Sequence, residues 1–340
     1  MRKFISGFVI LLMAVLVTAP FILGIFIQKK YPTLLSFYNL RDDVEVNVVD
    51  YQRNWFSSDV TLKVIVKNDD DLQETLKSLH AATTRFPPRY QFMVQQHIQH
   101  GPLIYWDSQH FPSIFGLAAI RNNVILSEDA RNLLTALGID EIKELSQYDF
   151  ITYRGNYFNQ IDLIIGKIQW VDRAIGPLYL QFGLHQFSVQ SIENLLNTYK
   201  KMMKQGQVYQ GQLRKKLFSL LPGMIHAGSA IELNQFDLTM PNGKIHMSAI
   251  IGWPYYHFVA PANLFEALQF ANANAVIHVS KSLLNDIIIL LENQKITMDA
   301  AKLQLNAFLK QGYIIDDGQD YTSSFRWTNG KLIVNGRVVQ

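Results

Sequence analysis

The chain has 340 residues, of which 49% are hydrophobic and 12% aromatic, so it can bury a sizeable core and does not belong to the disordered class. Its 31 Lys and Arg against 28 Asp and Glu leave a net charge of +3, which gives no general case for nucleic-acid binding. Cysteine is absent, which excludes disulfides, thiolate metal sites and cysteine nucleophiles.

The stretch from Phe4 to Ile27 contains no ionisable side chain and predicts a membrane-spanning helix. Basic residues flank it on both sides, and at about 1.5 Å of rise per residue it can cross roughly 30 Å of hydrocarbon. The lipid bilayer is therefore an expected partner through this N-terminal helix. No second run of this kind follows, so the rest of the chain is expected to be water-soluble.

A removable signal peptide is the alternative interpretation of this stretch. Signal peptides have an apolar core of about 7 to 15 residues and end in a small-x-small cleavage site. The nearest candidate, residues 17–19, is followed by Pro20, and the apolar run continues beyond it. A retained signal anchor is therefore expected. The positive-inside rule favours a cytoplasmic N-terminus, with the bulk of the chain exported.

Alternating apolar residues predict the first strands at 44–48 and 60–66, joined by a turn over Asn54–Ser58 that has aromatic anchors. A helix is expected over 72–82, and a third strand over 90–98 is closed by His100-Gly101-Pro102.

The middle of the chain predicts a short strand at 121–126, a helix at 127–137 and then three meander strands at 149–154, 161–170 and 178–187. The stretch 161–170 carries large apolar residues on both faces, which favours a sheet that binds an apolar ligand.

Residues 191–221 change to a helical period, with one apolar stripe and one lysine-rich face. The basic face could lie on an anionic lipid surface. An amphipathic helix packed on a sheet, with its lysines in solvent, explains the same pattern and is favoured because this is the ordinary state of surface helices. A sub-boundary of the domain is possible near 190–228.

The last third predicts two hairpins separated by helices. The first hairpin runs over 236–251 with a type I′ turn at Asn242-Gly243, and the second runs over 321–334 around Asn329-Gly330. The helices between them are expected at 261–270, 283–291 and 297–312.

The motif Tyr51-Gln52-Arg53-Asn54-Trp55-Phe56-Ser57-Ser58 resembles the Tyr-x-Arg-Gly-Trp-Phe-Ser-Ser signature of the YdgA-type bacterial inner-membrane family. His100-Gly101-Pro102 is similar to that family's His-Gly-Pro turn, and residues 320–336 are similar to its closing hairpin. Asn54 departs from the family's glycine, although asparagine also tolerates positive φ.

This resemblance covers both ends of the chain and implies a single-pass bacterial inner-membrane protein with a periplasmic domain and an unassigned biochemical role. Long anchored β meanders also resemble, at the level of fold, the AsmA-type envelope proteins associated with lipid handling.

The common sequence-visible enzyme motifs are missing: the phosphate-binding loop, the Gly-x-Ser-x-Gly elbow, the His-Glu-x-x-His helix and the dinucleotide fingerprint. His97 and His100 would project to opposite faces of one strand, which is a poor arrangement for a shared metal. The stretch 316–320 resembles part of a calcium loop but lacks its distal Glu, so a tight turn is expected. His185, His246 and His257 could meet in space.

No catalytic, cofactor-binding or metal-binding residue is therefore predicted, and no cofactor. Seven residues form the candidate interaction or structural motif: Tyr51, Arg53, Trp55, Phe56, His100, Gly101 and Pro102. Trp55 and Phe56 are core anchors of a turn or a docking site for a partner, Arg53 is a paired or stacked cation or part of that docking site, and His100 binds local backbone.

The sequence as a whole predicts an α+β fold: an N-terminal transmembrane helix over 1–30, then a large, curved, antiparallel β-meander domain over 31–340 with inserted amphipathic helices. The expected function is a non-enzymatic cell-envelope protein that binds a lipid-like or protein ligand. A scaffold for envelope proteins and an enzyme with a dispersed site are the alternatives.

Overall fold

The computed structural model describes residues 18–32, 35, 44–67, 89–104, 115–136, 138–152, 155–170, 173–204, 219–254, 260–283 and 298–339. The structure is mostly a large antiparallel sheet. The fold is therefore mostly β, and the α+β prediction is wrong. Long alternating stretches continue as strand well beyond the bounds predicted from the sequence: the strand predicted at 149–154, for example, runs over Ile139–Ile151.

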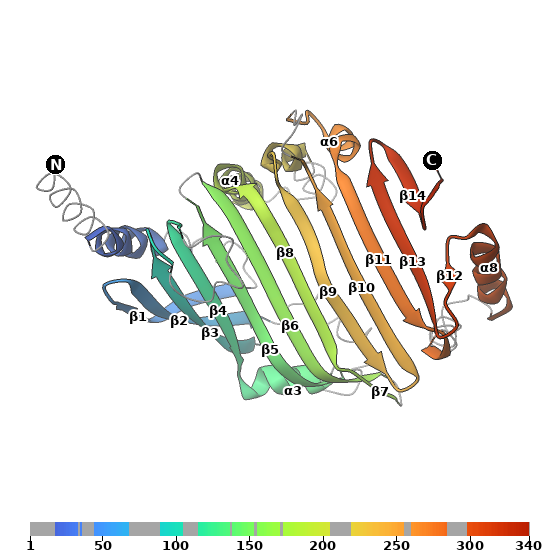
Figure 1. Ribbon diagram of the computed structural model, residues 1–340. Coiled ribbons are helices and arrows are strands. Elements are labelled where there is room, and N and C mark those ends of the chain that lie inside the picture. The colour runs from blue at the N-terminus through green and yellow to red at the C-terminus, as the bar shows by residue number, and fades with distance from the viewer. Residues whose placement is uncertain are drawn as a thin grey trace, which may run out of the picture. The chain divides into compact units, whose positions relative to one another are not determined.

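The strands are β1 (Val44–Arg53), β2 (Ser57–Lys67), β3 (Arg89–His100), β4 (Ala118–Leu126), β5 (Ile139–Ile151), β6 (Asn156–Trp170), β7 (Arg173–Ile175), β8 (Leu178–Ser188), β9 (Ala230–Met240), β10 (Gly243–Gly252), β11 (Asn272–Ser280), β12 (Ile315–Asp316), β13 (Asp320–Thr328), β14 (Lys331–Val334) and β15 (Arg337–Val338). The helices labelled in Figure 1 are α3 (Glu128–Ala136), α4 (Val189–Lys204), α6 (Leu264–Phe270) and α8 (Met298–Gln311). A short 3-10 helix, η2, spans Leu221–Met224.

The hydrogen-bonded strand order is β1-β2-β3-β4-β5-β6-β8-β9-β10-β11-β13-β14-β15, with β7 on β6 and β12 on β13. Every pair whose register the structure describes is antiparallel. The chain divides into two compact units, and both β5 and β6 contribute residues to each of them.

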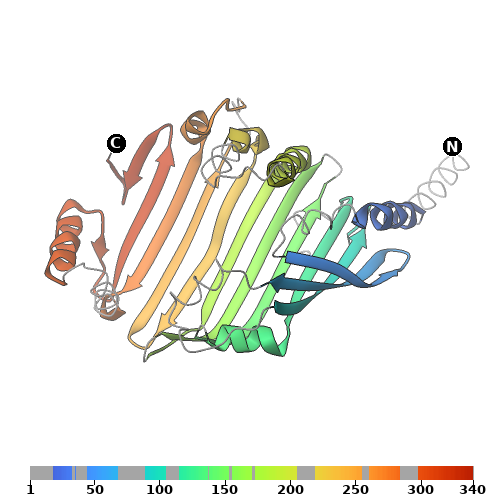
Figure 2. The ribbon, with the colours of Figure 1, turned by 180° about the vertical axis from the view of Figure 1, so that it is seen from behind.

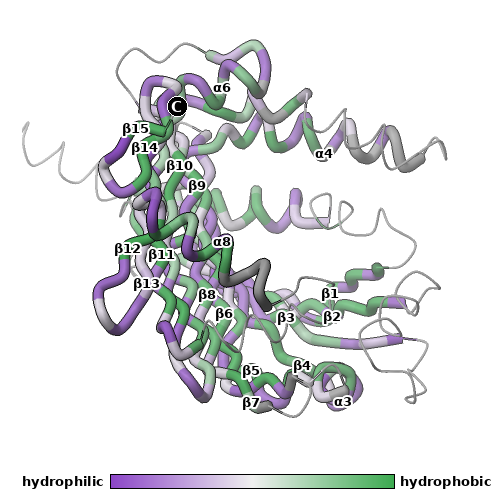
Figure 3. The backbone as a smooth tube through the Cα atoms, turned by 90° about the vertical axis from the view of Figure 1, so that its right-hand side faces the viewer, coloured by the Kyte–Doolittle hydropathy of each residue, from purple (hydrophilic) through white to green (hydrophobic). Residues whose placement is uncertain are grey.

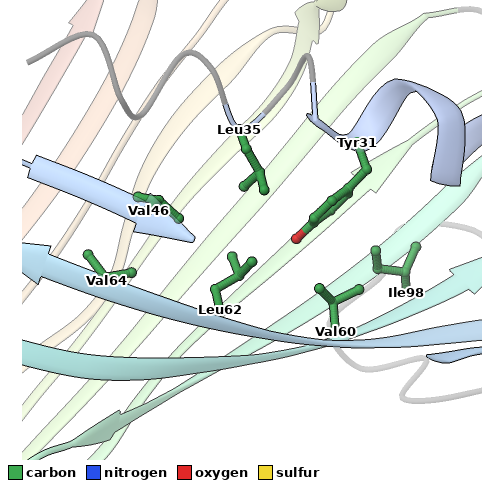
Figure 4. Packing of buried hydrophobic residues seen from close by; sticks show 7 residues of the cluster. All are labelled: Tyr31, Leu35, Val46, Val60, Leu62, Val64 and Ile98. Atoms are coloured by element: carbon green, nitrogen blue, oxygen red, sulfur yellow. The ribbon is translucent and has the colours of Figure 1, made fainter. Parts of the chain in front are cut away.

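Unit 1 comprises residues 1–137, 145–160 and 187–220. Its described part contains β1 to β4 and a helix over residues 18–32, which Figure 2 shows in dark blue beside β1 and β2. The core between this helix and the strands contains Tyr31 and Leu35 from the N-terminal segment, packed on five strand residues: Val46, Val60, Leu62, Val64 and Ile98 (Figure 4).

The structure contradicts the prediction that this helix spans a membrane. Among the described residues, no helix is both long and apolar enough to cross a membrane. The described part of the Phe4–Ile27 stretch, from residue 18 onward, turns Pro20 and Gly24 inward, and the helix continues beyond the stretch to bury Tyr31 against the strands. The rest of the predicted span, residues 4–17, lies outside the described residues.

Unit 2 comprises residues 138–144, 161–186 and 221–340. Its strands β8 to β11, β13 and β14 pair in that order, with β12 and β15 as two-residue additions. The closing hairpin is as predicted: Asn329 and Gly330 have φ of 51° and 70°, and Thr328 pairs with Lys331. Positive φ at both central residues is the geometry of a type I′ turn.

Two features of unit 2 differ from the sequence predictions. Asn242 does not have positive φ, and the β9–β10 turn consists of Pro241 and Asn242 between the paired Met240 and Gly243, so the type I′ turn predicted there is wrong. Strand β11 was not predicted at all. The predicted helix at 127–137 is confirmed by α3, and the one ending near 312 is confirmed by α8.

Other predicted elements fall partly or wholly outside the described residues. The helix expected at 72–82 and the histidine at position 257 lie there, as do most of the helix expected at 283–291 and the second half of the basic segment 191–221.

Candidate functional site

One face of the unit 2 sheet is apolar from β8 to β14. Because residues paired across antiparallel strands share a face, the registers place the alternate residues of each strand together. We call this surface the apolar face, and it consists of Leu178, Leu180, Phe182, Leu184, Ile231, Leu233, Phe236, Leu238, Ile245, Met247, Ala249, Ile251, Ala273, Ala275, Ile277, Val279, Tyr321, Ser323, Phe325, Trp327, Leu332 and Val334.

The opposite face of the same strands is mostly polar, and the alternation along the chain can be followed in Figure 3. His185 lies 3.2 Å from Glu232, and His246 pairs with Asp237. Hydrogen bonds from Gln235 and His246 hold the pKa of Asp237 below its usual value, against the effect of burial, which raises it. His185 and His246 therefore each bind a carboxylate of their own instead of meeting one another.

Two neighbouring cavities open on the apolar face. The larger, of about 420 Å³, lies between β11, β13 and β14 on one side and helix α8 on the other, which contributes Leu305 and Phe308. The smaller, of about 340 Å³, extends toward β8 and is lined by Phe182, Ala275 and Trp327 among others. Phe325 and Leu332 line both cavities, so the two adjoin.

The lining of these cavities is almost wholly hydrocarbon. Ser323 is 8% exposed, and its hydroxyl donates a hydrogen bond of 2.6 Å to the Tyr313 carbonyl oxygen. Most side chains of the apolar face are only half-buried. This is the chemistry of a site for an apolar ligand, in which shape and area replace polar contacts.

The seven motif residues lie in unit 1, where four of their side chains contact the helix 18–32: Tyr51, Arg53, Trp55 and His100. The Tyr51 hydroxyl donates to Ser58 Oγ at 3.2 Å, and Ser58 Oγ lies 3.0 Å from Nε2 of His100. Both Ser58 and His100 are 0% exposed. A serine–histidine pair needs an open approach to act as a nucleophile, so this buried pair packs the core instead.

The helix approaches His100 through Gly24. A Cβ atom at Gly24 would lie 2.5 Å from the His100 ring, closer than real carbon contacts. Burial, and after it the charge of Arg53, lowers the pKa of His100 to about 4. The imidazole is therefore neutral at pH 7 and fits the tight contact without a desolvated charge.

Arg53 and Trp55 both contact Phe21 of the same helix. The Arg53 guanidinium lies 4.7 Å from the centroid of the Phe21 ring, and the Trp55 ring lies 4.8 Å from Phe21. Arg53 is thus a stacked cation. Trp55 and Phe56 remain 47% and 42% exposed, so they are not the core anchors that the sequence favoured.

Gly101 and Pro102 fix the end of β3. The Gly101 amide donates to the Leu117 carbonyl at 2.8 Å, and a Cβ atom at Gly101 would overlap the Gly116 carbonyl oxygen. Glycine is therefore required for this close approach of two backbones. The motif supports a turn and a helix.

A buried polar network in unit 1 was not predicted from the sequence. The Tyr31 hydroxyl donates to Gln96, Gln96 to Asn122 at 2.5 Å, and Asn122 to Asp149 at 3.2 Å. Asp149 also accepts hydrogen bonds from Gln147, Tyr157 and Asn159, while burial raises its pKa. One signal was available: Gln96 interrupts a column of inward apolar residues on β3.

His97 and His100 do face opposite sides of β3, as predicted: His97 pairs with Asp59 at 2.5 Å on the side away from Ser58. Residues 316–320 form the turn between β12 and β13, where Asp316 pairs with Lys281. Within the described part of the chain, no group of three or more His, Asp or Glu side chains could hold a metal ion.

Comparison with protein families matches the chain to a family described as bacterial protein of unknown function (DUF945), over residues 1–156 and 141–340. This agrees with the expected resemblance to a bacterial family without an assigned role, but it confirms neither the YdgA-type name nor the likeness to AsmA-type proteins. A search of curated proteins found no match, and a search of solved structures found none either.

Proposed function

Because this chain belongs to the bacterial family of unknown function DUF945, we propose a function from its own geometry: a non-enzymatic cell-envelope protein that binds a lipid-like ligand on the apolar face of unit 2. In this proposal the domain lies on the periplasmic side of the bacterial inner membrane. The observation that carries it is the pair of adjoining apolar cavities, of about 420 and 340 Å³, on a continuous apolar face.

Burial of hydrocarbon supplies the binding energy in this proposal. Each methylene removed from water contributes about 0.8 kcal/mol, so an acyl chain that lies along several strands binds without any polar anchor. Soluble chains rarely expose contiguous apolar patches larger than a few hundred Å², and such patches usually serve binding. The half-buried side chains of the apolar face fit this role.

A polar substrate fits the same cavities poorly. Binding of such a molecule requires convergent donors and acceptors, because each unpaired polar group that is buried costs about 1 to 3 kcal/mol. The Ser323 hydroxyl is already used by Tyr313. A lipid-like ligand is therefore favoured over a polar metabolite, and a hydrophobic protein segment is the competing occupant.

The test is a titration of the purified full chain with the fluorescent fatty acid cis-parinaric acid. Ala275→Trp places an indole in the smaller cavity and is expected to weaken binding at least tenfold, because displacing about two methylenes from the face costs roughly 1.6 kcal/mol. Val276→Trp is the matched control. It adds the same ring to the neighbouring residue on the opposite face of β11, and binding should be unchanged.

Circular dichroism of both variants checks that the sheet is retained. Equal loss of binding in the two variants, or no binding of the fatty acid to the unmodified chain, would contradict the proposal. Native mass spectrometry with lipid extraction of the purified chain adds a second measurement, in which a copurifying protein in place of lipid would support the competing occupant.

A further inference from the structure

The helix 18–32 has two different sides. Its inner side buries Pro20, Gly24 and Tyr31 against unit 1, whereas its outer side leaves Ile22 61% and Phe26 58% exposed. Ile22 and Phe26 are one turn apart, so their side chains are neighbours on the helix surface.

The β1–β2 turn contributes two more exposed aromatic side chains beside the helix. Trp55 and Phe56 are 47% and 42% exposed, and Trp55 contacts Phe21, the residue next to Ile22, at 4.8 Å. We call the group of Ile22, Phe26, Trp55 and Phe56 the helix–turn patch. It joins two segments that are about 30 residues apart in the sequence.

Positive charge borders the helix–turn patch. Lys29 and Lys30 are exposed and follow Phe26 by three and four residues, which places them on the same side of the helix. Arg53 stacks on Phe21. Asp50 and Asp59 of β1 and β2 lie on the opposite face of the strands, where Asp59 pairs with His97 and also accepts a hydrogen bond from the Asn54 side chain.

We propose that the helix–turn patch docks unit 1 on the surface of an anionic lipid bilayer. Amphipathic aromatic rings and aliphatic side chains enter the headgroup region, while lysines pair with anionic headgroups. The helix remains packed on the strands and lies on the membrane without crossing it. Charge complementarity favours a lipid surface over a protein partner, because lysines are depleted from protein–protein interfaces.

The experiment measures sedimentation of the full chain with vesicles of POPC alone and of POPC with 30% POPG. Stronger binding to the POPG vesicles is expected, and 1 M NaCl should remove the difference. Each lysine near an anionic surface strengthens binding about fivefold, so the double variant Lys29→Glu/Lys30→Glu should weaken it at least about 30-fold. Trp55→Ser/Phe56→Ser should weaken binding to both vesicles.

Two matched controls carry the same chemical changes outside the patch. Lys310→Glu/Lys331→Glu reverses two exposed lysines of unit 2, and Leu303→Ser removes a side chain of α8 that is 74% exposed. Both controls should bind POPG vesicles like the unmodified chain. Because the rest of the chain is identical in every variant, any binding by other segments is common to all of them. Binding that is unaffected by the patch variants, or lost equally in the controls, would overturn the proposal.

Discussion

His100 shows how one buried side chain can join three segments of unit 1. Its ring meets Ser58 of β2 and lies against Gly24 of the helix, and its own backbone closes β3 by a hydrogen bond of 2.8 Å to the Phe56 carbonyl. The sequence motifs around positions 51–58 and 100–102 are thus two parts of one packing unit. Neither motif alone indicates that the third part is the N-terminal helix.

The depressed pKa of His100 predicts that unit 1 becomes less stable in mild acid. In the folded chain this pKa is about 4, and in the unfolded chain it is near 6.5, so between these values the unfolded chain binds the additional proton. The free energy of unfolding should therefore fall as the pH decreases from about 6.5 to 4, by about 3 kcal/mol from this group. Urea unfolding across this range measures the loss.

His100→Gln supplies the comparison, since glutamine keeps a donor for Ser58 but does not titrate. All other titratable groups, among them Asp149 with its raised pKa, are common to the unmodified chain and the variant. The difference between the two pH profiles isolates His100. Parallel profiles for the two proteins would show that His100 does not titrate as described.

At the scale of single residues, the sequence predicted the opposed faces of His97 and His100, and stacking was one of the alternatives that it left open for Arg53. It did not predict that Trp55 and Phe56 stay exposed, because an aromatic residue at a turn is compatible with a core or a surface position. The contact from Gln96 to Asn122 was also missed, since it depends on the register of β3 and β4.

At the scale of elements, the helix 18–32 is held in part by the close packing of Gly24 on the His100 ring. Gly24→Ala would place a methyl group 2.5 Å from the His100 ring, so either the helix or β3 must shift. Overpacking of this kind costs about 1 to 3 kcal/mol, and the free energy of unfolding in urea should fall by that amount.

Gly223→Ala is the matched control for this variant. A Cβ atom at Gly223 meets no atom within 4 Å, so the same substitution there should leave the free energy of unfolding nearly unchanged. If Gly24→Ala is as stable as this control, the close packing of the helix on His100 is wrong.

Strand β11 shows where reasoning from local sequence fails for an element. Its residues alternate between Ala273, Ala275, Ile277 and Val279 on one face and mainly polar residues on the other. Alanine is a weak strand former, and neighbouring helical signals obscured this pattern. The helical signal before β11 belongs to helix α6. Its N-cap is Asn263, whose side chain accepts a hydrogen bond of 2.9 Å from the Glu266 amide, and the helix ends before β11 begins.

At the scale of the whole molecule, the two units carry different surfaces: the helix–turn patch belongs to unit 1 and the apolar face to unit 2. Strand alternation was enough to predict a large antiparallel meander. The class was nevertheless wrong, because the bounds of long strands depend on partners that are distant in the sequence. The candidate ligand site was not predicted as a set of residues, since it requires the registers of six strands.

Ligand binding should therefore protect one unit only. At cis-parinaric acid concentrations of about 100 times the dissociation constant, linkage stabilises unit 2 by roughly 2.7 kcal/mol, which slows amide hydrogen exchange that occurs through opening of unit 2 about 100-fold. Hydrogen exchange measured by mass spectrometry should show this protection in β10, β11 and β13, with no change in β1 to β3. Equal protection of both units, or protection of β1 to β3 alone, would contradict the assignment of the ligand to unit 2.

The consecutive pairing of β8, β9, β10 and β11 has a consequence for how this surface can vary. Each added hairpin would widen the sheet by about 9.6 Å, because neighbouring strands lie about 4.8 Å apart. The pairing of the remaining strands would stay as it is, and every new strand with the same alternation would add another column of hydrocarbon. Under the proposed function, the area that the apolar face offers to an acyl chain thus increases with the number of hairpins.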